Sequence, residues 1–310
     1  MVKKTVGKLI ELSKMDLSHP LRSVTPGNHF RPTLFFYELV FKPFFNQRIG
    51  EHKKLKFHRL KTGEVAITWI GHSSFLIQFN DLSVLIDPNF ANWLFLLKRQ
   101  KKAGLDIEDI PPVDVILITH CHYDHFHKQT LRRLPSPKFG IMPWGTIRLT
   151  EGLGFKRIVE LEWWESLQHN GWRVSLTPAK HWGARYINDI HRGYGGFIIE
   201  HQGRTIYHAG DTAYFEGFNE IHKRFKPEIA LLPIGAAYPD SFRHVHMSPS
   251  DSLKAFIDLK AKTFIPMHYG HFKLAFEELD APSRILKDLA QKQGILKQIH
   301  FLEEGVPFVF

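Results

Sequence analysis

Three histidines and an aspartate lie close together in the middle of the sequence, directly after a short apolar segment. Residues 113–119 are rich in Val and Ile and predict a buried strand, and residues 120–125 then read HCHYDH. Because residues two apart in extended backbone point the same way, His120 and His122 can bind one metal ion. Asp124 and His125 lie beyond the turn and can face a second ion. Histidine-rich loops can also be merely solvated, but this spacing after a strand favours a site for two ions.

Three further candidates, His181, Asp211 and His268, each lie at or just past the end of a predicted strand. Loops at the carboxyl ends of strands are where α/β folds assemble their sites, so these side chains are expected to meet the first four. One ion would be held by His120, His122 and His181, the other by Asp124, His125 and His268, with Asp211 bridging the two. Nitrogen and oxygen ligands without sulfur favour zinc, and iron and manganese are the alternatives.

The sequence also suggests structural roles for two other residues, Asp87 and Cys121. Asp87, directly before Pro88, can hold a metal-binding histidine through its second ring nitrogen, as such imidazoles usually require; the alternative is a turn-forming Asp-Pro pair. Cys121 alternates with His120 and His122, so its side chain is expected to point away from the metal and to pack. As the single cysteine, it excludes an internal disulfide and thiolate-rich zinc sites.

Short strands separated by turn signals begin at about residue 64. Residues 65–70, 75–79 and 82–86 predict an antiparallel meander, and further strands are expected at 139–142, 157–161, 172–177, 196–200, 205–208, 229–233, 262–267 and 307–310. Helices are expected at 146–151, 219–225 and 282–293, and after Ser248, which is an N-cap followed by Pro249 and Asp251. Because no repeat or change in composition interrupts residues 56–310, we expect one catalytic domain there, preceded by an N-terminal extension of residues 1–55.

The predicted extension contains an aromatic segment, residues 34–45, with the sequence LFFYELVFKPFF. As a helix, this segment has charges only at Glu38 and Lys42, four residues apart on one narrow polar stripe. Two alternatives follow. The segment packs on its own domain or on a partner subunit of a homodimer, or it lies in a membrane surface whose anionic headgroups meet Lys53, Lys54 and Lys56.

The 310 residues carry a formal net charge of +10. Such a surplus suits an anionic partner, which can be a phospholipid surface, a phosphorylated substrate or nucleic acid. Lys and Arg are spread along the chain without a dense basic block, so nucleic-acid binding is disfavoured. Because neither a secretory signal nor a stretch of ~20 apolar residues is evident, we expect a cytoplasmic protein that is soluble or peripherally attached to a membrane.

Four of these segments together resemble the metallo-β-lactamase fold superfamily of metal-dependent hydrolases. They are residues 119–125, 178–182 (PAKHW), 209–212 (AGDT) and 267–270 (MHYG), and the resemblance covers most of residues 64–305. It implies an α/β fold of the αββα sandwich type, with the site at one edge of two packed sheets. The metal ligands proposed above carry over to the resemblance unchanged.

Other segments resemble one branch of that superfamily, the N-acyl-phosphatidylethanolamine-hydrolysing phospholipase D enzymes and their bacterial relatives. They are residues 69–74 (WIGHSS), 160–165 (ELEWWE), 181–182 (HW) and 232–236 (LPIGA). The resemblance implies that the substrate is a phosphodiester lipid. We expect the two ions to activate a water that Asp124 orients, and the aromatic segment to dock on the bilayer. His246 falls where this branch has a histidine near the substrate phosphate, so it would contact the phosphate or protonate the leaving group; the alternative is that it caps a helix.

One segment departs from that branch. Where the lipid enzymes have a Tyr-Glu-Pro-Arg run, this chain has Ala237, Tyr238, Pro239 and Asp240, with an acidic residue in place of the arginine. Tyr238 is a candidate for substrate binding, but recognition of the headgroup is left open. A soluble ester, such as a sugar-phosphate lactone, is therefore the alternative substrate.

Overall fold

The computed structural model describes residues 32–56, 59–135, 139–186 and 189–310. The first 31 residues of the predicted extension lie outside the described residues. Among the residues described, no helix is both long and apolar enough to span a membrane.

One sheet has seven strands and contains the predicted meander. Its order is β15 (Pro307–Val309), β1 (Ala66–Gly71), β2 (Ser74–Gln78), β3 (Ser83–Ile86), β6 (Val115–Leu117), β7 (Phe139–Pro143) and β8 (Ile158–Leu161). The first four strands pair antiparallel, whereas β3, β6, β7 and β8 are parallel. The carboxyl ends of β3 and β6 therefore lie at the same edge.

The second sheet has six strands. Its order is β14 (Thr263–Met267), β13 (Ile229–Pro233), β12 (Arg204–His208), β11 (Gly196–His201), β10 (Trp172–Thr177) and β9 (Ser166–His169). Strands β12, β13 and β14 are parallel, and β10 is antiparallel to β11, which is antiparallel to β12. The carboxyl ends of β10, β12 and β14 consequently share one edge.

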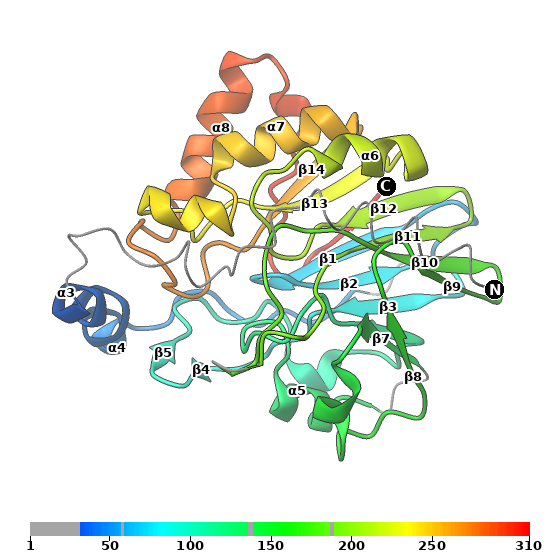
Figure 1. Cartoon of the computed structure of the whole chain (residues 1–310), viewed down its shortest axis with the longest axis horizontal. Coiled ribbons are helices and arrows are strands. Elements are labelled where there is room, and N and C mark those ends of the chain that lie inside the picture. The colour runs from blue at the N-terminus through cyan, green and yellow to red at the C-terminus, as the bar shows by residue number, and fades with distance from the viewer. Residues whose placement is uncertain (1–31, 57–58, 136–138, 187–188) are drawn as a thin grey trace.

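Helices cover the outer faces of both sheets, so the molecule has the four layers of an αββα sandwich (Figure 1). Helices α6 (Gly217–Phe225), α7 (Pro249–Leu259) and α8 (Ala281–Lys292) lie over the six-stranded sheet, and α5 (Lys128–Arg133) lies on the side of the other sheet. Ser248 caps α7 as predicted, since its hydroxyl accepts from the Asp251 amide while the Asp251 carboxylate accepts from the Ser248 amide.

The aromatic segment of the extension is helical, as predicted. It consists of α3 (Pro32–Phe36), a π-helical turn η1 (Tyr37–Phe41) and α4 (Lys42–Phe45), and Lys42 lies 3.4 Å from Glu38 on the polar stripe. A short hairpin, β4 (Trp93–Leu94) and β5 (Leu97–Lys98), lies near α4 at the same end of the molecule (Figure 1).

Some elements differ from the expectation. The helix predicted at 146–151 is a short 3₁₀ turn, η3 (Ile147–Thr150), because Gly152 and Gly154 follow it with positive φ and end the helical conformation. The hairpin β4–β5, strand β9 and helix α5 were not predicted. Three further 3₁₀ turns, η2 (Ile107–Asp109), η4 (Asp240–His244) and η5 (Leu296–Gln298), connect the main elements.

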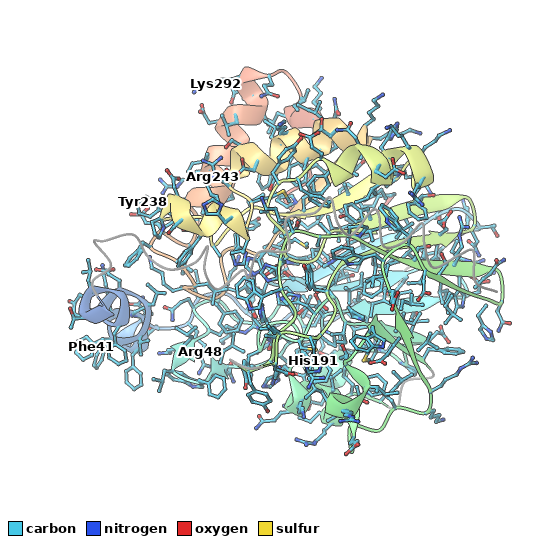
Figure 2. The ribbon with its side chains drawn as sticks, viewed as in Figure 1. Phe41, Arg48, His191, Tyr238, Arg243 and Lys292 are labelled. Carbon is cyan, nitrogen blue, oxygen red and sulfur yellow. The ribbon has the colours of Figure 1, made fainter. Side chains whose placement is uncertain are left out.

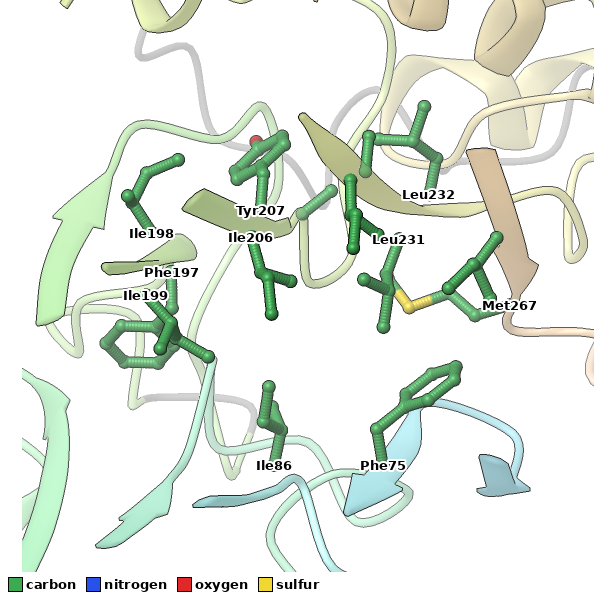
Figure 3. Packing of buried hydrophobic residues seen from close by; sticks show 14 of the residues in the cluster. Phe75, Ile86, Phe197, Ile198, Ile199, Ile206, Tyr207, Leu231, Leu232 and Met267 are labelled. Carbon is green, nitrogen blue, oxygen red and sulfur yellow. The ribbon is translucent and has the colours of Figure 1, made fainter. Parts of the chain in front are cut away.

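The main core lies between the two sheets. Phe75 and Ile86 of the seven-stranded sheet face Ile206, Leu231 and Met267 of the other sheet (Figure 3). Successive residues alternate in direction along each strand, so the neighbours Tyr207 and Leu232 point to the opposite face, toward the covering helices (Figure 3). A second cluster, which includes Cys121, packs on the outer face of the seven-stranded sheet, and the expectation that this side chain packs is confirmed.

Leu231→Ala is expected to lower the free energy of unfolding by about 2–5 kcal/mol, because it opens a cavity between the sheets. Ile257→Ala, on the exposed side of α7, is the matched control and should change it by less than ~0.5 kcal/mol. Denaturant unfolding followed by circular dichroism measures both. Equal effects of the two substitutions would contradict the packing described.

Candidate metal centre

The predicted metal ligands meet at the edge where strands from both sheets end. His120 and His122 follow β6, and His181, Asp211 and His268 follow β10, β12 and β14. Parallel pairing and the packing of the sheets bring these ends together, although the residues are far apart in the sequence. All of the seven predicted side chains belong to clusters of close potential ligands.

Three histidines form the first cluster. The Nε2 atom of His120 lies 2.9 Å from Nδ1 of His122, which lies 3.2 Å from Nε2 of His181. Ligands bound at 2.0–2.1 Å to a tetrahedral ion are about 3.4 Å apart, so these nitrogens have nearly the spacing that a metal ion requires. The ring of His181 is fixed by its other nitrogen, because Nδ1–H donates to the Val245 carbonyl at 2.8 Å.

Asp124, His125 and His268 form the second cluster. The Oδ2 atom of Asp124 lies 3.7 Å from Nε2 of His125 and 3.6 Å from Nε2 of His268. Asp211 lies between the clusters: its Oδ2 is 3.0 Å from His268 Nε2 and 3.3 Å from His125 Nε2. The same oxygen is 3.9 Å from Nε2 of both His120 and His181. This position suits a bridging carboxylate.

Asp87 and Thr119 orient two of these imidazoles from behind. Asp87 Oδ2 accepts a hydrogen bond from His125 Nδ1 at 2.7 Å, which is the contact that the sequence predicts for it. Thr119 donates to Asp87 through both its amide (2.8 Å) and its hydroxyl (2.6 Å). The Thr119 hydroxyl also lies 2.9 Å from Nδ1 of His120. In both histidines Nδ1 is thus engaged, and Nε2 faces the cluster.

The surroundings hold four of the ligand candidates in the protonation states of metal ligands, whereas Asp211 and Asp124 raise the pKa of His125 and of His268 against the effect of burial. Burial holds the pKa of His120 and of His181 well below the usual value, so both imidazoles are neutral. Burial opposes ionisation of Asp124 and Asp211, but the neighbouring His125 and His268 hold the pKa of both carboxyls well below the usual range. Neutral imidazole and ionised carboxylate are the forms that bind metals.

Several polar atoms of the cluster are buried without a hydrogen-bond partner. They include Nε2 of His125, Nε2 of His268 and Oδ1 of Asp211. A buried polar atom left unsatisfied costs about 1–3 kcal/mol, and divalent ions at this position would satisfy all three. The donor set, nitrogen and oxygen without sulfur, therefore fits divalent metal ions such as zinc.

The two predicted substrate-binding residues are placed differently from each other. His246 lies at the edge of the cluster, with its Nδ1 3.8 Å from Asp211 Oδ2 and its ring 5.1 Å from that of His181. Tyr238 is 59% exposed. Its backbone amide donates to the Glu277 carboxylate and its carbonyl accepts from the Phe276 amide, and neither partner belongs to the cluster.

Two residues at the site received no role from the sequence. His72 is buried, and its Nε2 lies 3.0 Å from Asp124 Oδ2; Thr119 supports Asp87 and His120 as described above. His72 follows strand β1, which is the same signal that singled out His181, Asp211 and His268. Applying that criterion to every histidine and aspartate that follows a predicted strand would have identified His72.

Comparisons with known proteins agree with this geometry. The profile of the beta-lactamase superfamily domain matches residues 83–269. The N-acyl-phosphatidylethanolamine-hydrolysing phospholipase D of Saccharomyces cerevisiae is 32% identical over 77% of this chain, which spans only 54% of that relative. A metal-dependent hydrolase from Myxococcus xanthus is 32% identical over 73% of this chain and 78% of its own length.

Solved structures share the architecture. A metallo hydrolase from Ignicoccus hospitalis has a TM-score of 0.63 and 25% identity, covering 80% of this chain and 98% of its own. An isothiocyanate hydrolase from Delia radicum gut bacteria has a TM-score of 0.66 and 22% identity, covering 78% of this chain and 98% of its own, and shows the fold alone. With the converging histidines and aspartates at its sheet edge, the chain belongs to the metallo-β-lactamase superfamily and is a metal-dependent hydrolase.

Proposed function

We propose that this protein is a phosphodiesterase of the phospholipase D type that hydrolyses N-acyl-phosphatidylethanolamine to an N-acylethanolamine and phosphatidic acid. Similarity to the yeast phospholipase D supports the reaction, although this chain spans only 54% of that protein. The observation that carries the lipid assignment is a set of exposed aromatic side chains on the N-terminal helical segment and on the hairpin β4–β5, whose tip contacts the turn that carries His122 and Asp124.

The metal centre in this proposal contains two zinc ions, with iron and manganese as alternatives. His120, His122 and His181 would hold one ion and Asp124, His125 and His268 the other, and Asp211 lies between the two clusters. Bound divalent ions of this kind supply Lewis acidity and lower the pKa of a water molecule toward 7. The water oxygen bonds to phosphorus, the bond from phosphorus to the ethanolamine oxygen breaks, and a proton passes to that leaving oxygen.

Two side chains act on the substrate and the water. The Asp124 carboxylate, ionised and held at the centre, accepts a hydrogen bond from the attacking water and orients it. Burial lowers the pKa of His246 to about 4, so its ring is neutral at pH 7. A neutral imidazole donates a hydrogen bond to a phosphate oxygen readily but is a poor source of a proton, which favours phosphate contact over protonation of the leaving group. Tyr238 remains a candidate for headgroup contact.

The aromatic surface begins on the helical segment. Leu39 and Pro43 of this segment are buried against the domain, whereas Phe36, Phe41 and Phe45 are exposed. Figure 2 shows Phe41 at the outer edge of the molecule. Among the described residues these rings are exposed rather than packed in the core, and we assign them to a membrane surface, with a second subunit as the alternative.

The hairpin β4–β5 extends this surface toward the site. The rings of Phe44 and Trp93 lie 5.5 Å apart, and at the tip of the hairpin the ring of Phe95, which is 71% exposed, lies 4.3 Å from that of Tyr123. Tyr123 separates His122 from Asp124 in the sequence. An exposed apolar surface beside the turn that carries two candidate ligands suits a substrate that is itself embedded in a bilayer better than a soluble ester.

Charge contributes less to this surface than the sequence suggests. Lys53 is paired with Glu303, and Lys54 with Asp109 at 2.9 Å, so two of the three lysines expected to meet headgroups have acidic partners in the chain. Lys98 lies 6.0 Å from the Phe44 ring centroid and 5.9 Å from that of Trp93, within the aromatic surface. We therefore assign docking mainly to the aromatic side chains.

The reaction is tested by incubating zinc-loaded protein with vesicles that contain N-acyl-phosphatidylethanolamine, followed by mass spectrometry of the products. The wild type is expected to release N-acylethanolamine and phosphatidic acid, and His122→Ala should release neither because a metal ligand is lost. Metal content is measured in the same samples. No release from a wild type that contains both ions would overturn the lipid assignment and favour a soluble ester.

Asp87→Asn is expected to weaken metal binding by about 10–100-fold, because it replaces the acceptor that holds the His125 imidazole in place. Asp81→Asn is the matched control. Asp81 lies in the turn between β2 and β3, and its carboxylate accepts a hydrogen bond from the buried His201. Elemental analysis after dialysis against a weak chelator compares the two variants with the wild type. Equal metal retention in all three would exclude this role for Asp87.

Phe41→Ser and Phe95→Ser are each expected to weaken binding to anionic phospholipid vesicles roughly tenfold, because each removes about 1.4 kcal/mol of apolar burial. Ile285→Ser, an exposed apolar residue on α8, is the control and should bind as the wild type. Vesicle sedimentation measures binding, and size-exclusion chromatography measures the oligomeric state. A dimer that dissociates on substitution, with unchanged vesicle binding, would assign the surface to a subunit interface.

A further inference from the structure

We infer that His72 is a positioning residue that fixes Asp124 and His268 for the second metal ion, through a hydrogen bond from its Nε2–H to the Asp124 carboxylate. The inference rests on the metal centre proposed above and adds a residue to its support. Nε2 of His72 lies 3.0 Å from Oδ2 of Asp124, and the His72 side chain is completely enclosed by protein.

Three hydrogen bonds fix the backbone of His72. Its carbonyl accepts from the Trp69 indole N–H at 2.9 Å and from the His268 amide at 3.1 Å, and its own amide donates to Nδ1 of His271 at 3.0 Å. Gly71 makes the close approach to His271 possible, because a Cβ at Gly71 would lie 2.5 Å from His271 Nε2. The turn between β1 and β2 is therefore fixed to the loop that follows β14.

His72 adopts a left-handed backbone conformation, with φ of 57°. Such a conformation is uncommon outside glycine and occurs mostly where surrounding contacts enforce it, often at functional sites. Here it directs the imidazole into the cluster rather than toward solvent. A residue that only closed a hairpin would not require this buried orientation.

One histidine thus contacts all three side chains assigned to the second ion, since its ring also lies 5.7 Å from that of His125. Its ring packs against that of His268 with centroids 4.1 Å apart, and its carbonyl binds the His268 amide. Its Nε2–H reaches Asp124 across 52 positions of the sequence. Because β1 belongs to one sheet and β14 to the other, His72 also links the sheets where the second cluster forms.

A direct ligand role for His72 is the competing interpretation, since its ring nitrogen belongs to the same cluster as Asp124, His125 and His268. The Nε2 atom of His72 makes a hydrogen bond to Asp124, whereas Nε2 of His125 and of His268 makes none. An Nε2 that carries a hydrogen toward Asp124 has no lone pair for a metal. Residues that hydrogen-bond to a metal ligand in this way keep the ligand in place without binding the ion themselves.

Three substitutions at His72 separate these roles. His72→Ala removes the donor. His72→Gln restores an amide N–H near the position of Nε2, and His72→Asn places its amide too far from Asp124 to replace the bond. Asn tolerates left-handed backbone well, so His72→Asn is expected to fold even if the other variants do not. His201→Asn is the matched control, because His201 is also a buried histidine bound to an aspartate, Asp81, at 2.7 Å.

Calorimetric titration of zinc into chelator-stripped protein measures the number of ions and their affinities without reference to activity. The wild type and His201→Asn should bind two ions. His72→Ala and His72→Asn should keep one ion at wild-type affinity and bind the other about 10–100-fold more weakly, whereas His72→Gln should stay within about threefold of the wild type.

Each other outcome overturns the inference in a recognisable way. Two ions bound at wild-type affinity by His72→Ala and His72→Asn would exclude the positioning role and leave the metal centre intact. A loss in His72→Gln as large as that in His72→Ala would mean that the imidazole itself, and not its hydrogen bond, is required. Fewer than two ions in the wild type would overturn the proposed centre together with the role of His72.

Discussion

The burial of ionised carboxylates beside several imidazoles, at the edge where both sheets end, is the constraint on which the rest of the site depends. A buried charge is strongly unfavourable unless it is paired. In the protein alone, Asp124 and Asp211 obtain positive charge from His125 and His268, and the two carboxylates in turn raise the pKa of His268 to about 9 against the effect of burial. Divalent ions would supply that charge and also accept the lone pairs of the histidines.

The fold meets this constraint by fixing the loops that follow the strands. His72, Asp87 and His268 lie at the ends of three different strands and have φ values of 57°, 44° and 60°. Such backbone costs about 1–3 kcal/mol per residue and is maintained only by the surrounding contacts. Here those contacts are hydrogen bonds. One set joins Thr119 to Asp87, and another joins the β1–β2 turn to the end of β14. Backbone strain and metal-ligand candidates are thus found together.

Much of the site could be predicted because each ligand candidate follows a strand closely, and strands with strong hydrophobic patterns are easy to find. Asp87 could be anticipated from the chemistry of metal-binding imidazoles. The hairpin β4–β5 and its link to Tyr123 could not, because its two-residue strands are too short to give a periodic pattern. The pairing of Lys53 with Glu303 joins residues 250 positions apart and leaves no local signal. Contacts of that kind depend on tertiary structure alone.

The membrane-facing proposal depends on the same loops. The hairpin that carries Phe95 borders the turn that carries His122 and Asp124, so the surface for docking and the centre for chemistry are adjacent. Because Lys53 and Lys54 are paired with the chain's own carboxylates, we assign attraction to a bilayer mainly to apolar contact. A substrate at a bilayer surface would then lie close to the turn that carries two of the candidate ligands.

Anomalous diffraction from crystals of the metal-loaded protein tests the central claim most directly, because it locates the ions without any assumption about the substrate. Two anomalous peaks are expected, one among His120, His122 and His181 and one among Asp124, His125 and His268, with Asp211 in contact with both. A single peak, no peak, or ions bound by other residues would contradict the two-metal centre.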